Sequence, residues 1–252
     1  MKVTAFVGSA RKKHTYNATK QFLEKLQSLG NVEYEIVMLS DYKLGTCKGC
    51  MQCLNKGEEL CPFKDDRDKL MQKIIDSDGI IFATPNYSFQ VSGYMKIFLD
   101  RIAFCFHRPR FFGKTCTNIV AQGIYGGRNI VKYLDFIAGG LGFNVVKGLC
   151  ITTREPISEK RQEKIDKLID RQSMKFYKEL VKKEYPTPTF FKLIMFRVSR
   201  TMMRLMLDKG STDYVYYKKK GWFRSDYYYP TRLNPIKKAV GKLSDIAANL
   251  TK

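Results

Sequence analysis

The sequence is poor in histidine and contains no long apolar run. Its 252 residues include two histidines, His14 and His107, and no nucleophile-elbow motif, so a Ser-His-Asp hydrolase is not indicated. No uncharged stretch reaches the roughly 18 apolar residues that a membrane span requires. The apolar run near the N-terminus is too short for a signal peptide. These absences favour a cytoplasmic protein, in which thiols stay reduced and disulfides are rare.

The two common glycine motifs of nucleotide sites are also missing. The first apolar run is followed by GSARKKHTYNA, which is neither the GxGxxG of a Rossmann dinucleotide site nor the GxxxxGKS/T of a Walker loop. No known DNA-binding motif is present either, so nucleic acid is an unlikely partner.

Acidic residues are scarce relative to basic ones. The chain has 45 Lys and Arg against 24 Asp and Glu, a formal net charge of +21. Residues 151–252 hold 24 of the basic residues and 11 of the acidic ones, so this part alone carries a net +13. Such a surface attracts anions, whether nucleotides, anionic lipid or nucleic acid, without choosing among them.

Short apolar runs alternate with helical patterns along the first 152 residues. Five runs are predicted as buried strands, at residues 3–9, 34–40, 79–85, 117–123 and 144–152. Helices are predicted between them, at residues 17–29, 66–78, 91–103 and 130–142. This alternation predicts an α/β fold with a doubly wound, five-stranded parallel sheet of the flavodoxin-like kind.

The pattern changes after about Glu155. Residues 158–185 predict a long charged helix, the PTP at 186–188 breaks it, and residues 190–209 predict a second, more apolar helix. The end of the chain is rich in Tyr, Lys and Pro and includes Trp222. Because there is no low-complexity linker, the sequence predicts an ordered helical, aromatic and basic C-terminal extension.

Polar and aromatic residues follow three of the predicted strands. The loop after the first strand is basic and opens a helix, where free N–H groups and the helix dipole favour a phosphate. The loops PNYS at 85–88 and GIYGG at 123–127 offer aromatic walls and close backbone approach. Ligands of open α/β sheets bind beyond the carboxyl ends of the strands. Together the loops suit a mononucleotide with a flat ring system.

Three motifs carry a resemblance to a known family. GSARKKHTY, CKGCMQC with a later cysteine and DD, and TPNYSFQVSGYMKIFLDR resemble the NADPH-dependent FMN reductases of the flavodoxin-like superfamily. More narrowly, they resemble the cysteine-containing branch that includes the iron–sulfur flavoproteins. The resemblance covers roughly residues 1–150, and the third motif is the most specific.

The resemblance implies an FMN site at the three loops. Residues implied for the phosphate are Ser9, Arg11, Thr15 and Tyr16. Residues implied for the ribityl chain and the ring are Pro85, Asn86, Tyr87 and Ser88. Residues implied for the other edge of the ring are Gly123, Tyr125, Gly126 and Gly127. The chain departs from many relatives at Lys13-His14, where they carry Gly-Asn.

The resemblance also implies the chemistry, and the change of pattern near Glu155 predicts the domain division. Residues 1–154 would form the FMN-binding domain, and residues 155–252 would form an extension packed on it or on a partner subunit. The protein would be an FMN-dependent NAD(P)H oxidoreductase of the flavin or quinone reductase type, passing electrons to a small-molecule acceptor. No protein acid or base is obligatory, and no catalytic residue is assigned. One alternative is an electron carrier with a ferredoxin-like donor, and another is a flavin-containing protein that docks on a membrane or nucleic acid.

Four cysteines lie in the spacing C-x2-C-x2-C-x7-C, at Cys47, Cys50, Cys53 and Cys61. This spacing resembles the motif of the iron–sulfur flavoproteins and could wrap a 4Fe-4S cluster. The alternative is that the cysteines are unmetallated and line a loop. Structural zinc ranks third, because it more often uses two separated C-x2-C pairs. The remaining cysteines, Cys105, Cys116 and Cys150, fall on predicted helix or strand and are interpreted as buried small apolar residues.

The basic tail has two interpretations. In the first, helix 190–209 packs on the body or on a partner subunit, its Arg197, Arg200 and Arg204 are solvated, and the aromatic tail contributes to a homodimer. In the second, the helix lies on anionic lipid and the aromatic residues sit at the headgroup level. We favour the first, so a membrane surface ranks behind a dimer contact.

Overall fold

The computed structural model describes residues 1–250, and the chain divides into two compact units. The first unit comprises residues 1–48 and 63–183. The second comprises residues 49–62 and the chain from Glu184 onward. Each unit has its own packing.

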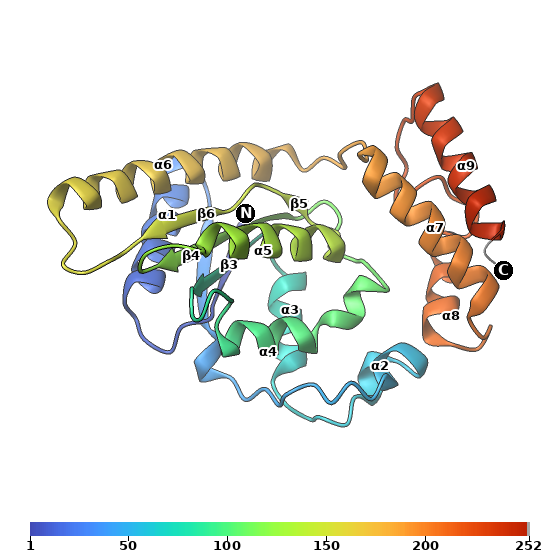
Figure 1. The fold of residues 1–252 in the computed structure, drawn as a ribbon, viewed down its shortest axis with the longest axis horizontal. Helices are drawn as coiled ribbons and strands as arrows, with labels where there is room; N and C mark the ends of the chain where they lie inside the picture. Colours follow the sequence, from blue (N-terminus) through green and yellow to red (C-terminus); the bar gives the residue numbers. More distant parts are fainter. Residues whose placement is uncertain (251–252) are drawn as a thin grey trace. The chain divides into compact units, whose positions relative to one another are not determined.

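A parallel sheet forms the centre of the first unit (Figure 1). Its strands are β1 (Lys2–Val7), β2 (Glu33–Met38), β3 (Gly79–Pro85), β4 (Thr115–Gln122), β5 (Asn144–Val145) and β6 (Leu149–Thr152). The order is β2-β1-β3-β4-β5, β6 also pairs with β4, and every pairing is parallel. All seven residues of β3 are buried, as expected for a strand covered on both faces. The order confirms the predicted flavodoxin-like sheet.

The last predicted strand, residues 144–152, is interrupted rather than continuous. Asn118 of β4 donates from Nδ2 to Oδ1 of Asp135 at 2.7 Å, and the same oxygen accepts from the Gly148 amide at 3.1 Å. A Cβ at position 148 would lie 2.1 Å from Asn118 Oδ1, so only glycine fits there. This polar contact takes the chain out of the ladder between Val145 and Leu149. The result is two short strands in place of one.

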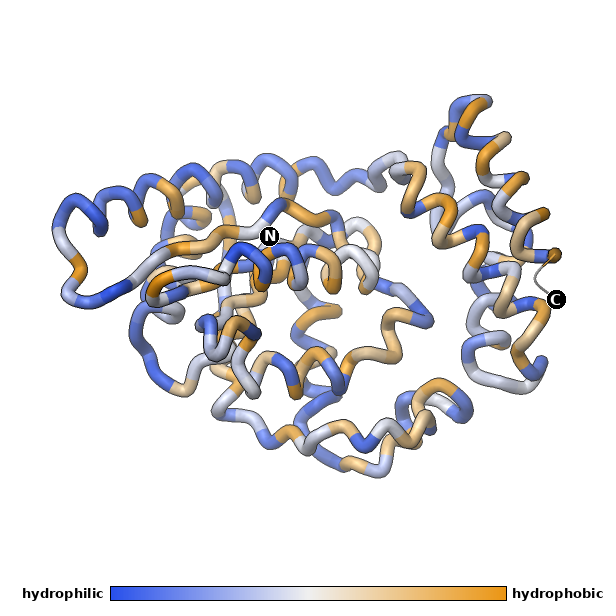
Figure 2. The backbone as a smooth tube through the Cα atoms, viewed as in Figure 1, coloured by the Kyte–Doolittle hydropathy of each residue, from blue (hydrophilic) through white to orange (hydrophobic). Residues whose placement is uncertain are grey.

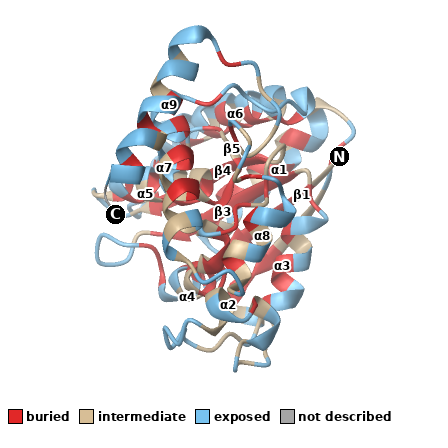
Figure 3. Ribbon diagram, turned by 90° about the vertical axis from the view of Figure 1, so that its right-hand side faces the viewer, coloured by how far each residue is buried: buried red, intermediate tan, exposed pale blue. Residues whose placement is uncertain are grey.

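Helices cover both faces of the sheet. The helices of this unit are α1 (His14–Leu29), α3 (Arg67–Ile75), α4 (Gly93–Arg101), α5 (Gly127–Leu141) and α6 (Glu159–Lys182), with short 3-10 turns at Leu39–Asp41 and Ala103–Phe106. On one face, Val3, Ala5 and Val7 share a core with Phe22 of α1 and Phe176 of α6. On the other face, Phe6 stacks on Phe98 of α4 with ring centroids 4.9 Å apart. Buried residues concentrate on the strands and on the helix faces that meet them (Figure 3).

Helix α6 belongs to the sheet unit, although the sequence division placed it in the extension. Its Phe176 meets Phe22 edge to face at 5.8 Å, and Gln21 Nε2 donates to Asp166 Oδ1 at 3.0 Å. Ile169 and Leu180 are buried in the same core. The compact units therefore divide the C-terminal part after residue 183, whereas the sequence placed a domain boundary at 154.

The second unit is helical and aromatic. It contains α2 (Gln52–Asn55), a 3-10 turn at Glu58–Leu60, α7 (Phe190–Met206), α8 (Thr212–Lys219) and α9 (Pro235–Leu250). Thr189 caps α7 and Ser211 caps α8, each by accepting an amide hydrogen from the first turn. None of the described helices is both long and apolar enough to cross a membrane.

The aromatic tail packs inside this unit. Tyr217, Trp222 and Tyr227 are almost completely buried. Trp222 lies edge to face on Tyr217 at 4.9 Å, and its Nε1 donates to the carbonyl of Tyr228 at 2.9 Å. For these three residues the prediction of a dimer seam or a lipid headgroup level is therefore wrong, because their rings fill the unit's own core.

Two of the three arginines of α7 are buried, so the expectation of solvated arginines is wrong for them. Arg197 pairs with Asp226 at 3.2 Å, and Arg200 pairs with Asp245 at 2.7 Å. Arg204 is exposed, as expected. The sequence pattern missed the two pairs because their acidic partners lie 29 and 45 residues further along the chain.

Candidate functional site

The loop after β1 is held tightly against the start of α4. The Gly8 amide donates to the Ala83 carbonyl of β3 at 2.8 Å, and the Ser92 hydroxyl donates to the Gly8 carbonyl. A Cβ at position 8 would lie 2.7 Å from Ser92 Oγ and 2.9 Å from Met95 Cβ. Glycine is therefore needed for this close approach. The loop then turns outward, with Ser9 Oγ donating to the Arg11 carbonyl at 3.0 Å.

Helix α1 begins directly after this loop. Within the described residues, no side chain caps its start and no acidic residue lies in its first turn. Its first N–H groups and the positive end of its dipole therefore complement an anion. Arg11 and Lys13 are exposed beside it and add positive charge. This corner has the electrostatics that a phosphate requires.

The loop after β3 is a tight hairpin. The Asn86 amide donates to the Ala121 carbonyl at 2.8 Å, and the Asn86 side chain donates to the Tyr125 carbonyl at 2.9 Å. Tyr87 and Gln90 exchange two backbone hydrogen bonds. Ser88 and Phe89 between them have φ of 49° and 63°, the left-handed conformation of a type I′ turn. Such a conformation costs a non-glycine residue roughly 1–2 kcal/mol, so the surrounding contacts must enforce it.

Gln122 organises the loop after β4. Its Oε1 accepts from the Gly127 amide at 2.7 Å, and its Nε2 donates to Thr152 Oγ1 at 3.0 Å and to the Ile124 carbonyl at 3.2 Å. The loop also touches the hairpin, since the rings of Phe89 and Tyr125 lie 5.1 Å apart. Gln122 thus links the ends of β4 and β6 to the start of α5.

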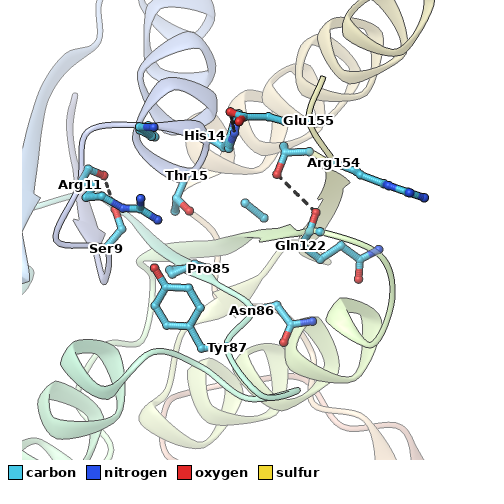
Figure 4. Close-up of a pocket in the computed structure, with 14 residues that line it drawn as sticks. Ser9, Arg11, His14, Thr15, Pro85, Asn86, Tyr87, Gln122, Arg154 and Glu155 are labelled. Atoms are coloured by element: carbon cyan, nitrogen blue, oxygen red, sulfur yellow. Dashed lines mark hydrogen bonds and ion pairs between the residues drawn. The ribbon is translucent and has the colours of Figure 1, made fainter. Parts of the chain in front are cut away.

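These loops enclose one side of a cavity of about 420 Å³ (Figure 4). The residues that line it are Ser9, Arg11, Lys13, His14, Thr15, Pro85, Asn86, Tyr87, Ala121, Gln122, Gly123, Thr153, Arg154 and Glu155. Its size lies within the range typical of sites for small molecules and cofactors. The cavity sits beyond the carboxyl ends of β1, β3, β4 and β6, where open α/β sheets bind ligands.

A side-chain hydrogen bond closes the corner between α1 and the segment after β6. His14 Nε2 lies 2.8 Å from Glu155 Oε1 (Figure 4). Among the described lining residues, Glu155 is the sole acid, whereas Arg11, Lys13 and Arg154 are basic. Because the one carboxylate faces His14, the cavity keeps a positive character suited to an anionic ligand.

The structure brings seven of the twelve residues implied by the resemblance together at this cavity. They are Ser9, Arg11, Thr15, Pro85, Asn86, Tyr87 and Gly123. The other five lie beside it. Tyr16 of α1 packs against the core, Ser88 lies at the tip of the hairpin, Tyr125 and Gly126 lie in the loop beyond Gln122, and Gly127 begins α5.

Several lining residues were not singled out from the sequence. Gln122, Thr153, Arg154 and Glu155 join the site because β6 ends next to β4. A signal for the last three was present, since the strand predicted to end at residue 152 points its carboxyl end to the same edge of the sheet. Gln122 lies at the end of the predicted strand 117–123 and had the same signal, but its hydrogen bonds to Thr152 and Gly127 could not be predicted from a local pattern.

The four cysteines of the C-x2-C-x2-C-x7-C motif do not form a metal centre here. Cys47 and Cys50 are exposed, and Cys53 and Cys61 are half-buried. Among residues 1–250, no group of three or more His, Cys, Asp or Glu side chains is arranged to hold a metal ion. The thiols suit an iron–sulfur cluster chemically, but no cluster is assigned to them.

The Asp-Asp that follows these cysteines has a structural role. Asp65 accepts from the Gly45 amide at 2.9 Å and the Arg67 amide at 3.2 Å, and it forms an ion pair with the buried Arg101. Asp66 accepts from the Lys43 amide at 2.8 Å. Burial acts to raise the pKa of Asp65, but the Arg101 guanidinium and the two amides outweigh it and hold the pKa below its ordinary value.

Of the remaining cysteines, Cys116 and Cys150 lie on strands as predicted, whereas Cys105 lies in the 3-10 turn at Ala103–Phe106. Cys105 and Cys116 are buried, which confirms their interpretation as small apolar residues, and burial raises the pKa of the Cys116 thiol well above its usual value. Cys150 is half-buried on β6. Burial raises the pKa of this thiol as well, so neither Cys116 nor Cys150 is a ready nucleophile.

Comparison with known proteins places this chain in a family. The NADPH-dependent FMN reductase family matches residues 1–155. An iron-sulfur flavoprotein of Archaeoglobus fulgidus is 35% identical over 160 residues, which cover 59% of this chain and 71% of that protein. An iron-sulfur flavoprotein of Clostridioides difficile is 27% identical over 220 residues, covering 85% of this chain and 94% of its own.

Solved structures agree on the fold. RosB superposes with a TM-score of 0.60 at 13% identity, covering 93% of this chain and 92% of its own. An NAD(P)H:quinone oxidoreductase from Methanothermobacter marburgensis superposes with a TM-score of 0.54 at 15% identity, covering 69% of this chain and 97% of its own. At such low identities these likenesses speak for the fold alone. The match over residues 1–155 carries the assignment: this chain belongs to the NADPH-dependent FMN reductase family.

Proposed function

We propose that the protein is an FMN-dependent oxidoreductase that takes electrons from a nicotinamide cofactor and passes them to a small acceptor. Family membership supports the flavin-dependent class. The observation that carries the proposal is the cavity at the carboxyl ends of four strands, which is basic at one end and walled by amide, proline and tyrosine groups at the other. Those two ends match the phosphate and the flat ring of FMN.

The basic end would hold the phosphate. Ser9 and Thr15 supply hydroxyls, Arg11 and Lys13 supply positive charge, and the first turn of α1 supplies N–H groups. The Lys13-His14 departure is compatible with this assignment, because Lys13 adds a cation to the lining and His14 contacts the Glu155 carboxylate. Tyr16 is not assigned to the phosphate, since this residue of α1 packs against the core of the sheet unit.

The opposite end would hold the ribityl chain and the ring. Pro85 and Tyr87 offer apolar and aromatic surface, and Asn86 is fixed in orientation by the Tyr125 carbonyl. Gln122 and Gly123 bring backbone and amide groups to the facing edge. When bound, FMN supplies the hydride acceptance and electron transfer, so the residues of the chain need only bind it, orient it and shield it. No side chain is assigned as acid or base.

The electron carrier with a 4Fe-4S cluster is the second candidate. The names of the relatives in Archaeoglobus and Clostridioides favour it. No group of metal-holding side chains is found among residues 1–250, so no electron path through a cluster is proposed. A ferredoxin-like donor belongs to this candidate alone.

The proposal is tested by cofactor binding and reduction. The purified chain should bind FMN and, without oxygen, lose its flavin absorbance on addition of NADPH or NADH. Arg11→Ala should weaken FMN binding roughly tenfold to a hundredfold, as expected for one charge-assisted contact. Arg161→Ala, an exposed arginine on α6 away from the cavity, is the matched control and should bind as wild type. A chain that neither retains nor rebinds FMN would overturn the proposal.

A further inference from the structure

Helix α9 packs in its unit through its small residues. Gly241, Ser244 and Ala248 are its buried positions, and they lie on one side of the 16-residue helix. A Cβ at position 241 would lie 2.8 Å from Nε of Arg197 on α7, so the two helices approach closely. The face that holds α9 to the protein therefore contains almost no large apolar surface.

The large apolar residues of α9 face solvent instead. The exposed fractions are 66% for Ile236, 63% for Leu243, 56% for Ile246 and 80% for Leu250. At about 100° per residue these four lie within roughly a third of the helix circumference. Figure 2 shows hydrophobic positions recurring along α9. An exposed apolar stripe of this kind on a surface helix usually marks a site that binds a membrane, a ligand or another protein.

The charges beside the stripe have one sign. Lys238 and Lys242 are exposed along its edge. Asp245 is the one acid in the α9 sequence, and it is held by Arg200 at 2.7 Å and by the Thr201 hydroxyl at 3.1 Å. Its negative charge is therefore neutralised on the α7 side. The outward side of α9 offers apolar and positive groups together.

We propose that α9 docks parallel to an anionic lipid surface, with its leucine and isoleucine stripe inserted and its lysines against the headgroups. This combination of a strong apolar face with flanking lysines is the pattern of interfacial helices. A second copy of the chain fits poorly, because two such faces would oppose lysine to lysine with no acid to pair them. Nucleic acid would leave the aliphatic stripe uncovered. The membrane interpretation thus moves from α7, where Arg197 and Arg200 are buried, to α9.

The contribution of each group can be ranked. One lysine near an anionic surface contributes about fivefold to the partition coefficient. Insertion of an isoleucine or leucine side chain contributes roughly tenfold or more. Removal of one lysine and one isoleucine from α9 should therefore weaken binding about fiftyfold. The inference does not depend on flavin chemistry.

Vesicle co-sedimentation of the full chain tests the proposal. Wild type should bind vesicles of phosphatidylcholine with roughly a third phosphatidylserine, release from them as salt is raised, and bind pure phosphatidylcholine far less. Lys242→Gln/Ile246→Gln should lose about fiftyfold. The matched control is Lys132→Gln/Phe136→Gln on α5, which also removes an exposed lysine and an exposed large apolar residue four positions apart. It should bind as wild type.

Three outcomes would overturn the proposal. The first is equal sedimentation of wild type and the α9 variant. The second is an equal loss in the α5 control. The third is a failure to bind vesicles combined with a dimer that the α9 variant dissociates, which would assign the stripe to a second copy. Thermal unfolding of each variant should match wild type, because every substituted side chain is solvent-exposed or nearly so.

Discussion

Removal of the Gln122 side chain should weaken FMN binding by loosening the loop after β4. The amide makes three hydrogen bonds, at 2.7, 3.0 and 3.2 Å, to groups on three different segments. For a half-exposed group each bond contributes roughly 0.7 kcal/mol, so Gln122→Ala should cost about 2 kcal/mol of loop order. If FMN binding has to restore that order, its dissociation constant should rise about thirtyfold.

Because Gln122 also lines the cavity, a second variant must separate loop order from direct contact. Thr152→Val removes the acceptor at 3.0 Å and alters no lining residue, so it should raise the dissociation constant about threefold. Gln122→Glu keeps an acceptor for the Gly127 amide and loses both donors, so it should fall between the two.

Quenching of FMN fluorescence on titration measures each dissociation constant. Gln27→Ala on the exposed face of α1 is the control and should leave it unchanged. A Gln122→Ala protein that binds FMN within twofold of wild type would refute the idea that this side chain organises the site. A Thr152→Val protein identical to wild type would restrict the role of Gln122 to direct contact.

Three further predictions concern stability, the cysteines and assembly. Asp65→Asn should lower the free energy of unfolding by about 3 kcal/mol in urea, because it leaves the buried Arg101 without its carboxylate partner; Asp68→Asn, whose carboxylate is exposed, should cost far less. The folded-state pKa of Asp65 is lowered, so the contribution of Asp65 to the free energy of unfolding is complete above the ordinary carboxyl pKa and is lost as the pH falls through the folded value. Wild type, but not Asp65→Asn, should therefore lose this stability at acid pH. Replacement of Cys47, Cys50, Cys53 and Cys61 by serine should leave FMN content and NAD(P)H oxidation nearly unchanged, and a preparation made without oxygen that carries four irons per chain would contradict this. A homodimer should be seen by light scattering at micromolar concentration, with the exposed Leu168, Met174 and Val181 of α6 as candidate contacts in place of the buried aromatic tail; a clean monomer mass would contradict it.

The fold of the first unit could be predicted because its signals are local. The continuous apolar run at β3 predicts a strand buried on both faces, and Gly8-Ser9 predicts a turn in which the backbone packs closely before a helix. The interruption between β5 and β6 could not be predicted, since it depends on Asn118 meeting Asp135 and the Gly148 amide across the sheet.

The same distinction holds for the site and the tail. Loop residues at predicted strand ends, such as Arg11 and Asn86, could be proposed because strand ends converge. The pairing of His14 with Glu155 joins residues 141 positions apart and leaves no local pattern. Arg200 looked like a solvent-facing arginine on an amphipathic helix because its acid, Asp245, lies on another helix.

The two aspartates that follow the cysteines, Asp65 and Asp66, also hold two distant parts of the backbone together. The amides of Lys43 and Gly45 donate hydrogen bonds to Asp66 and Asp65. The two ends of residues 46–64 are therefore fixed side by side, whatever the sequence between them. The entropy of closing such a loop changes slowly with its length, by only about 0.6 kcal/mol for each doubling. Insertions, deletions or new metal ligands within residues 46–64 therefore disturb the sheet very little. The segment can therefore vary in length and sequence while its two ends keep their place beside the sheet.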